Sequence, residues 1–308
     1  MSDSSTLPTL AIVGPTGSGK SSVAFALAKQ LGGEIISCDS VQVYRGFDVG
    51  SAKATLAEQK EVPHHLVDVA DWQETYDSQR FREDTTRLIS EIRTRGHHPI
   101  LCGGTGLYFR VLRWGVIDVP AADAAFRSEW EEREAQEPGV VVRRLQEVDP
   151  ESVAAIAKNN VRHQIRALEI FEMTGKKASV VKREHGFKDE EVSMLAFWLQ
   201  WPAEQLRLRI RERVDLMLGQ GFVDEVRRLL DQGVEPDCQA MRAVGYREVV
   251  QYIQGAFDEP ELSERIWKST WAYARRQRTW LRKEKKLTGL EVTTLENTVE
   301  LIQSQLKS

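Results

Sequence analysis

The chain has 308 residues, 29% of them charged, and a formal net charge of −4 at pH 7. This composition is ordinary for a soluble globular protein, and the length allows one large domain or two. Three distant cysteines without a Cys-x-x-Cys pair argue against a disulfide framework or a zinc finger and favour a reducing compartment. With no signal-peptide pattern and no apolar run approaching about 18 residues, we expect a cytoplasmic protein without membrane association.

A glycine-rich loop near the N-terminus is the most informative motif. It matches the phosphate-binding pattern Gly-x4-Gly-Lys-Ser/Thr and consists of Gly14, Pro15, Thr16, Gly17, Ser18, Gly19, Lys20 and Ser21. The run 10–13 predicts a buried strand before it, and the run 21–28 predicts a helix after it. Backbone N–H groups of such a loop surround an anion, while Lys20 adds positive charge and the Ser21 hydroxyl can bind Mg²⁺. The loop predicts a ligand with a di- or triphosphate. A dinucleotide fingerprint is disfavoured because Ser22 replaces its third glycine.

The first hundred residues alternate between strands and helices. Strands are predicted at 10–13, 34–38, 65–69 and 99–102, and helices at 21–28, 77–95 and 107–113. This alternation predicts a parallel sheet with helices on both faces. Ligands bind at the carboxyl ends of such strands, where four polar or glycine-rich segments lie: the phosphate loop, 39–42, 68–71 and 103–106.

The pattern changes from about residue 120. Residues 120–187 are charged and helical apart from a strand-like run at 139–142, which indicates a helical insertion. A strand at 194–199 returns the chain to the sheet, and helices are predicted at 203–218, 221–232, 241–255 and 262–286. We predict an α/β fold with a P-loop parallel sheet core flanked by helices at 1–119. A helical insertion domain follows at 120–190, and the second part of the core, with a helical C-terminal region, occupies 191–308.

Two strand ends carry candidate catalytic residues. Asp39 directly follows the second strand, where a carboxylate could hold Mg²⁺, accept a proton or bind a hydroxyl, although a turn cap with Ser40 is the plainer interpretation. Thr105, after the fourth strand, could donate its hydroxyl to a phosphate, or belong to a simple tight turn. Hydrolytic phosphate-loop enzymes commonly end a strand with an Asp that binds Mg²⁺. Cys102 and Gly103 stand there instead, which favours a diphosphate that is held rather than cleaved between its phosphorus atoms.

Basic residues gather in the second half of the chain. Arginines alternate along 207–213, and one or two of them are expected to reach a diphosphate. On the last long helix, one side carries Arg275, Arg278, Arg282 and Lys285. Such a row predicts a polyanionic partner such as RNA, with a solvated basic face as the alternative. The adjacent pairs His64-His65 and His97-His98 lack the spacing of a metal site on a helix face.

Seven segments together resemble the bacterial tRNA dimethylallyltransferases. They are the phosphate loop, Asp-Ser-Val-Gln-Val-Tyr-Arg at 39–45, Pro-His-His-Leu at 63–66, Gly-Gly-Thr-Gly-Leu-Tyr at 103–108, Arg-Ala-Leu-Glu at 166–169, Arg-Ala-Val-Gly-Tyr-Arg at 242–247 and Arg-Arg-Gln-Arg-Thr-Trp-Leu-Arg at 275–282. Their order and spacing match over nearly the whole chain. Eukaryotic relatives often add a C-terminal zinc finger, and its absence here suits a bacterial form.

The resemblance implies a reaction. The N6 amine of adenosine 37, beside the tRNA anticodon, would attack the first carbon of dimethylallyl diphosphate, and diphosphate would leave. Loop amides, Lys20 and Mg²⁺ bound at Ser21 would stabilise the leaving group, with Thr16, Thr105 and Arg213 in contact with it. Asp39 would accept a hydrogen bond or a proton from the amine. The implied catalytic residues are therefore Asp39, Thr105 and Lys20.

The resemblance also implies a large tRNA-binding surface, with the insertion gripping the anticodon stem-loop. The residues at matching positions are Asp39, Ser40, Val41, Gln42, Thr105, Arg127, Arg162, His163, Gln164, Ile165, Arg166, Arg242, Ala243, Val244, Gly245, Tyr246, Arg247, Arg275, Arg276, Gln277, Arg278, Thr279, Trp280, Leu281 and Arg282. A monomer is the expected state. Two alternatives remain open: a small-molecule kinase with the same loop and Mg²⁺, and a non-catalytic RNA-binding protein that uses a nucleotide as a switch.

Overall fold

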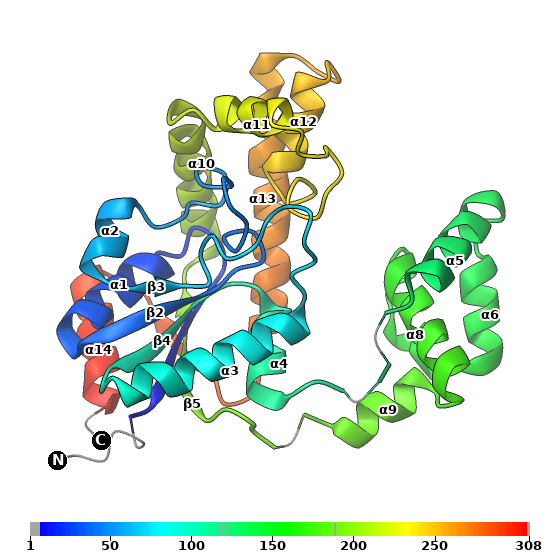
Figure 1. Cartoon of the computed structure of the whole chain (residues 1–308), viewed down its shortest axis with the longest axis horizontal. Helices are drawn as coiled ribbons and strands as arrows, with labels where there is room; N and C mark the ends of the chain where they lie inside the picture. The colour runs from blue at the N-terminus through cyan, green and yellow to red at the C-terminus, as the bar shows by residue number, and fades with distance from the viewer. Residues whose placement is uncertain (1–6, 118, 121, 188, 307–308) are drawn as a thin grey trace. The chain divides into compact units, whose positions relative to one another are not determined.

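The computed structural model describes residues 7–117, 119–120, 122–187 and 189–306 (Figure 1). The chain divides into two compact units, which we describe separately. The core unit combines Met1–Arg113 with Glu191–Ser308, and the helical unit is Trp114–Glu190. These boundaries lie close to the 120–190 insertion expected from the sequence.

The core unit is built on a parallel sheet, as the sequence predicted. Its described strands lie in the order β3-β2-β4-β1-β5-β6, and every neighbouring pair is parallel. The strands are β1 (Thr9–Val13), β2 (Gly33–Cys38), β3 (His64–His65), β4 (His98–Gly103), β5 (Met194–Gln200) and β6 (Thr288–Glu291). The helices are α1 (Lys20–Leu31), α2 (Leu56–Glu61), α3 (Ser78–Thr94), α4 (Gly106–Trp114), α10 (Ala203–Gly219), α11 (Phe222–Asp231), α12 (Tyr246–Ile253), α13 (Glu259–Leu281) and α14 (Leu295–Leu306).

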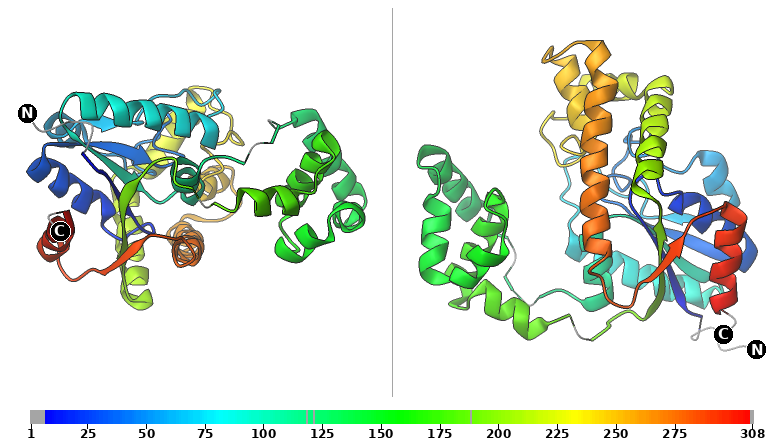
Figure 2. Two further views of the ribbon diagram at one scale, coloured as in Figure 1. Left: turned by 90° about the horizontal axis from the view of Figure 1, so that it is seen from below. Right: turned by 180° about the vertical axis from the view of Figure 1, so that it is seen from behind.

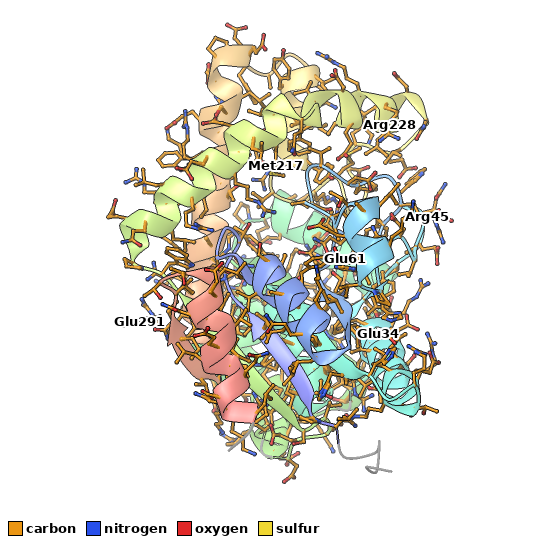
Figure 3. All side chains as sticks on the ribbon, turned by 90° about the vertical axis from the view of Figure 1, so that its left-hand side faces the viewer. Glu34, Arg45, Glu61, Met217, Arg228 and Glu291 are labelled. Carbon is orange, nitrogen blue, oxygen red and sulfur yellow. The ribbon has the colours of Figure 1, made fainter. Side chains whose placement is uncertain are left out.

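Helices cover both faces of this sheet (Figure 2). Successive side chains of a strand point to opposite faces. Leu10 and Ile12 therefore join one apolar cluster with α1 and α14, whereas Ala11 and Val13 join the other with α3, α4, α10 and α13. Figure 3 views the first of these faces, with α1 between α14 and α2. The covered sheet leaves the carboxyl ends of the strands as the place for a ligand.

Several predicted elements differ from the observed ones. The strand expected at 65–69 stops at His65, because Leu66 and Asp68 adopt left-handed φ values of 59° and 56° that no strand allows. The helix expected from 241 begins only at Tyr246, and turns occupy the residues before it. The sequence analysis did not predict β6 and α14, which extend the sheet and cover its first face.

The helical unit has its own apolar core. Its helices are α5 (Ala124–Gln136), α6 (Val140–Val148), α7 (Pro150–Ala155), α8 (Val161–Thr174) and α9 (Ala178–His185). Trp130, Val141, Leu145 and Leu168 are buried together in this core. The valines at 140–142, which read as a possible strand, form the first turn of α6 because Gly139, with φ of 90°, starts the helix. Across both units, no helix within the described residues is long and apolar enough to span a bilayer.

Candidate active site

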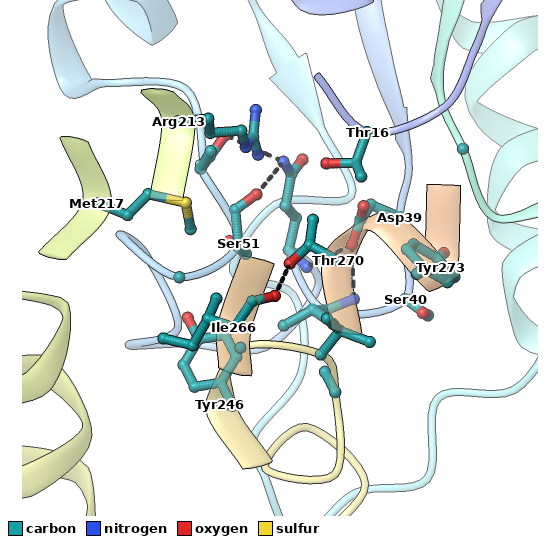
Figure 4. A pocket seen from close by; sticks show the side chains of 18 of the residues that line it. Thr16, Asp39, Ser40, Ser51, Arg213, Met217, Tyr246, Ile266, Thr270 and Tyr273 are labelled. Atoms are coloured by element: carbon teal, nitrogen blue, oxygen red, sulfur yellow. Dashed lines mark hydrogen bonds between the residues drawn. The ribbon is translucent and has the colours of Figure 1, made fainter. Parts of the chain in front are cut away.

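A cavity of about 350 Å³ lies at the carboxyl ends of β1, β2 and β4 (Figure 4). The phosphate loop, residues 39–42 and residues 103–104 line it, so three of the four segments predicted to form a site do meet. The fourth, 68–71, is not part of its lining, because Asp68 pairs with Lys53 at 2.6 Å and Asp71 pairs with Arg45 at 2.8 Å. The remaining walls come from residues 50–52, α10, residues 242–247 and α13.

The phosphate loop has the backbone that an anion site needs. Gly17 and Gly19 adopt φ values of 80° and 82°, which are strained for residues with a Cβ. Gly19 is the N-cap of α1 and provides no capping side chain, so the first N–H groups of the helix have no acceptor within it. These groups and the positive end of the helix dipole favour a phosphate at the cavity wall formed by Lys20 and Ser21.

Three side chains distant in sequence hold the phosphate loop in place. Gln277 Oε1 accepts a hydrogen bond from Thr16 N–H at 2.9 Å. The indole Nε1 of Trp201 donates to Ser18 O at 2.9 Å, and Arg209 Nε donates to Gly17 O at 2.9 Å. The Arg209 guanidinium also stacks 4.4 Å from the centre of the Trp201 ring. The loop is thus fixed before any ligand arrives.

Gln277 has a different role from the one predicted for it. The sequence analysis placed it among the tRNA contacts, but its side chain is buried. Its Nε2 donates to Gly104 O at 2.9 Å while its Oε1 binds the phosphate loop. A Cβ on Gly104 would lie 2.4 Å from this Nε2, so only glycine allows the approach. Gln277 therefore joins the two glycine-rich segments of the site.

Two cations meet at the phosphate end of the cavity. Burial lowers the pKa of Lys20, and the charge of Arg213 lowers it further. Burial also lowers the pKa of Arg213, while the charge of Asp39 opposes this shift. Both cations are therefore removed from water in the folded protein, and a bound diphosphate would give them a partner of opposite charge. Of the alternating arginines, Arg213 is the one that lines the cavity.

The other arginines of that run have partners outside the cavity. Arg209 supports the phosphate loop, as described above. Arg211 pairs with Glu264 at 2.7 Å, and Arg207 lies 4.7 Å from the ring of Trp267. The expectation that one or two of these arginines face the ligand, and that most do not, agrees with this arrangement.

Asp39 combines the two interpretations that the sequence left open. Its Oδ1 accepts hydrogen bonds from Val41 N–H at 2.9 Å and Gln42 N–H at 3.3 Å, so it caps a turn. Both bonds use the same oxygen, which fixes the carboxylate while Oδ2 takes part in neither. The next residue, Ser40, donates its N–H to Thr105 Oγ1 at 3.2 Å. Asp39 lines the cavity, whereas Thr105 is not part of its lining and is joined to it through Ser40.

Helix α13 contributes a row of cavity residues, three of which, Ile266, Thr270 and Tyr273, were not predicted from the sequence. Ile266, Thr270, Tyr273 and Gln277 recur every three or four residues and line the cavity together. Burial and then the charge of Asp39 raise the pKa of the Tyr273 hydroxyl, which stays neutral beside that carboxylate. The three- to four-residue spacing of these cavity residues is present in the sequence, but on a helix it equally fits a face packed in the core.

The oxygen donors of the cavity suit a cation that is held mainly by a bound diphosphate. Ser21 and Asp39 both line the cavity and offer oxygen atoms, the type of donor that Mg²⁺ prefers. No group of three His, Cys, Asp or Glu side chains in the described part of the chain could hold a metal ion. At the position of the usual metal-binding Asp, burial raises the pKa of Cys102 to about 11, so this thiol is neutral.

Residues 242–247 line the cavity, and Gly245 and Tyr246 among them are buried. Tyr246 is only 1% exposed, and its hydroxyl donates to Glu225 Oε1 at 2.7 Å. The Glu225 carboxylate also accepts hydrogen bonds from the N–H groups of Val49 and Gly50 at 2.6 and 3.2 Å. The ring of Tyr246 therefore packs the cavity wall and is not free to contact tRNA, whereas Arg242 is exposed.

The basic side of α13 is the part of the predicted tRNA surface with the clearest exposure. Arg275, Arg276, Thr279 and Arg282 are exposed. Burial and the neighbouring charge of Arg282 lower the pKa of Arg278. One predicted contact needs correction, because Leu281 is 1% exposed and belongs to the core. Trp280 is partly buried and packs against Gly106, where a Cβ would lie 2.4 Å from its ring.

In the helical unit, two predicted tRNA contacts have an internal partner. Arg127 and Arg166 bind the same oxygen of the fully buried Glu169 at 2.9 and 2.6 Å. Burial opposes ionisation, yet hydrogen bonds from both arginines hold the pKa of Glu169 below its usual value. Gln164 and Ile165 are buried and have packing roles instead of tRNA contacts. The exposed members are Arg162 and His163.

Comparisons with known proteins agree with this arrangement. A family model described as IPP transferase matches residues 42–284. The tRNA dimethylallyltransferase of Halorhodospira halophila is 45% identical over 281 residues, 90% of both chains, and tRNA dimethylallyltransferase 1 of Trichlorobacter lovleyi is 43% identical over 276 residues, 89% of this chain and 90% of that one.

Solved structures match as well. The tRNA isopentenylpyrophosphate transferase of Bacillus halodurans superimposes with a TM-score of 0.72 at 35% identity, over 98% of this chain and 97% of that one. A eukaryotic dimethylallyltransferase acting on tRNA gives a TM-score of 0.73 at 28% identity, over 94% and 74%. From its sequence, fold and site, the chain belongs to the IPP transferase family.

Proposed function

We propose that this protein transfers the dimethylallyl group of dimethylallyl diphosphate to the N6 amine of adenosine 37, next to the anticodon of tRNA. The observation that carries the proposal is one cavity with a phosphate-binding loop and two cations at one end and a fixed carboxylate, Asp39, at its side. A diphosphate and an amine can therefore meet in it. The names of the relatives support tRNA as the acceptor and a dimethylallyl group as the part transferred.

In this reaction the leaving group is activated first. The N–H groups of the loop, Lys20 and Arg213 bind the diphosphate and stabilise the charge that it gains as the bond between its oxygen and the first prenyl carbon breaks. Cations and N–H groups stabilise this developing negative charge most strongly in a partly desolvated site. Ser21 would hold a Mg²⁺ ion at this end of the cavity, and the ion would supply further positive charge there.

The amine then needs orientation. A purine N6 lone pair is delocalised into the ring, so the amine is a poor nucleophile and depends on alignment with the carbon it attacks. The Asp39 carboxylate accepts a hydrogen bond from N6 as the N–C bond forms and takes the proton that the amine loses. The electron pair of the broken C–O bond leaves with the diphosphate, so atoms and charges balance.

The tRNA binds through exposed basic groups around the cavity, with the target base turned out of its stack at a cost of a few kcal/mol. Arg242, Arg275 and Arg282 are exposed and contact the RNA backbone. Arg162 and His163 do so from the helical unit. The protein acts as a monomer.

Mass spectrometry of nuclease-digested tRNA tests this proposal. After incubation of the enzyme with tRNA, Mg²⁺ and dimethylallyl diphosphate, we expect adenosine 37 to gain one five-carbon unit. A parallel reaction with ATP in place of the prenyl donor should leave the tRNA unchanged. ADP formation with small acceptors and no prenylated adenosine would instead identify a kinase.

A further inference from the structure

The cavity has an apolar end to which the chemistry above assigns no role. It is lined by Val214, Met217, Phe222, Tyr246 and Ile266. Figure 4 shows Met217, Tyr246 and Ile266 on the side of the cavity opposite Asp39 and Tyr273. Because pockets for small ligands use apolar walls to hold apolar groups, this end is suited to a hydrocarbon chain rather than to phosphate or a base edge.

The position of this wall follows from helix α10. Arg213 and Met217 lie four residues apart, so they share one face of the helix and are separated by about 6 Å along its axis. A prenyl diphosphate whose charged end binds Arg213 therefore brings its chain beside Met217. In a nucleophilic displacement, the attacking amine, the attacked carbon and the leaving oxygen lie on one line. The rest of the prenyl chain therefore extends to the side of that line, away from Asp39.

Most side chains of the apolar wall are fixed by packing and cannot shift to enlarge the cavity. The rings of Phe222 and Tyr246 pack edge to face with centres 5.0 Å apart. They press on Gly50, where a Cβ would lie 2.1 Å from Phe222 and 2.5 Å from Tyr246. The Tyr246 hydroxyl is in turn bound to Glu225 at 2.7 Å. A longer chain cannot displace side chains that are fixed on every side.

Met217 is the exception in this wall. It is only partly buried, unlike Val214, Phe222, Tyr246 and Ile266. Its unbranched thioether side chain fills irregular space and is readily replaced by smaller groups. Shortening this one residue therefore lengthens the cavity without disturbing the packed rings.

We propose that Met217 sets the length of the prenyl chain that the protein accepts. Its side chain closes the apolar end after one isoprene unit, so a ten-carbon donor such as geranyl diphosphate is excluded. This inference rests on the proposed function, because it concerns the donor of that reaction. In a hydrophobic pocket, one extra methylene group lowers kcat/KM by about 10- to 200-fold. The decrease for a whole extra isoprene unit is larger still.

The test compares dimethylallyl and geranyl diphosphate as donors to an anticodon stem-loop. Wild-type protein, Met217→Ala and Met217→Val are measured together with two controls. Met217→Leu keeps the volume, and Leu216→Ala changes the neighbouring side chain, which is 59% exposed and does not line the cavity. We expect the ratio of kcat/KM for the ten-carbon over the five-carbon donor to rise at least about tenfold in Met217→Ala, and less in Met217→Val. Both controls should keep the wild-type ratio.

The outcomes separate the inference from the function on which it rests. Wild-type protein that transfers no five-carbon unit would overturn the proposed function. Wild-type protein that uses both donors equally would overturn the inference alone. So would a folded Met217→Ala or Met217→Val variant that still excludes the ten-carbon donor while transferring the five-carbon one.

Discussion

A single buried amide connects the two halves of the diphosphate site. Gln277 binds Thr16 in the phosphate loop and Gly104 after β4, with both hydrogen bonds at 2.9 Å. Both partners use backbone atoms, the N–H of Thr16 and the carbonyl of Gly104. The site therefore depends on a residue that need not touch the substrate.

Replacing Gln277 with leucine tests this role. The variant leaves one buried N–H and one buried carbonyl without a partner, so we expect a loss of about 1–3 kcal/mol in the free energy of unfolding. We also expect kcat/KM for dimethylallyl diphosphate to fall by at least about tenfold, because the loop loses its fixed position. Urea unfolding and steady-state kinetics measure the two effects. Gln303→Leu, on the exposed side of α14, is the control and should change stability by less than about 0.5 kcal/mol.

At the scale of elements, α13 serves two purposes with two faces. One face carries Ile266, Thr270, Tyr273 and Gln277 into the cavity. Another presents Arg275 and Arg282 to solvent. Within the described residues, Arg275, Arg278 and Arg282 form no ion pair with a carboxylate, although like charges in a row repel one another. Such a face is stabilised when a polyanion neutralises it.

Alanine at Arg282 should weaken tRNA binding and reduce its salt dependence. Loss of one phosphate contact lowers the slope of log affinity against log salt concentration by about 1. Arg265→Ala is the matched control on the same helix, since Arg265 already pairs with Glu261 at 2.8 Å. The measurement is the tRNA affinity of the wild type and both variants at two salt concentrations. Equal slopes for Arg282→Ala and wild type would show that this arginine does not contact RNA.

At the scale of the whole molecule, an ionic cluster stabilises the end of the sheet away from the site. Glu34, at the start of β2, accepts hydrogen bonds from Arg95 through both carboxylate oxygens, and its oxygens also bond His65 and His97 at 2.5 and 2.7 Å. One histidine of each adjacent pair, His65 and His97, thus belongs to a structural cluster. Hydrogen bonds from Arg95, ahead of those from the histidines, lower the pKa of Glu34 from 4.5 to about 2.

This shift predicts how stability depends on pH. Because the carboxylate is favoured in the folded state, its contribution is complete above pH 4.5 and is lost as the pH falls towards 2. A shift of this size corresponds to about 3 kcal/mol. At pH 7, Glu34→Gln should have a free energy of unfolding that is lower by an amount of that order. In urea unfolding, this free energy should also fall less between pH 4.5 and 2 than it does in the wild type. Glu61→Gln removes a half-exposed carboxylate paired with Lys29 and should have little effect; both positions are labelled in Figure 3. A wild-type pH profile in Glu34→Gln would contradict the cluster's role.

The sequence predicted the parts of this molecule that depend on local patterns. The phosphate loop, Asp39 and most core strands follow from glycine spacing and apolar runs, and the structure places the first two in one cavity. The hydrogen bond between Gln277 and Thr16 links residues 261 positions apart, so no local sequence pattern predicts it. Burial explains two further differences: Tyr246 and Leu281 match the family pattern, but tertiary packing turns their side chains inward.

The central claim is that the diphosphate site and Asp39 act on the two reactants in one cavity. Single-turnover transfer to an anticodon stem-loop, measured for wild-type protein and Asp39→Asn, tests it most directly. We predict that the variant binds both substrates with nearly unchanged affinity, while the rate of transfer falls by about 10²- to 10⁴-fold. A wild-type transfer rate in the folded variant would remove Asp39 from the mechanism and contradict the account.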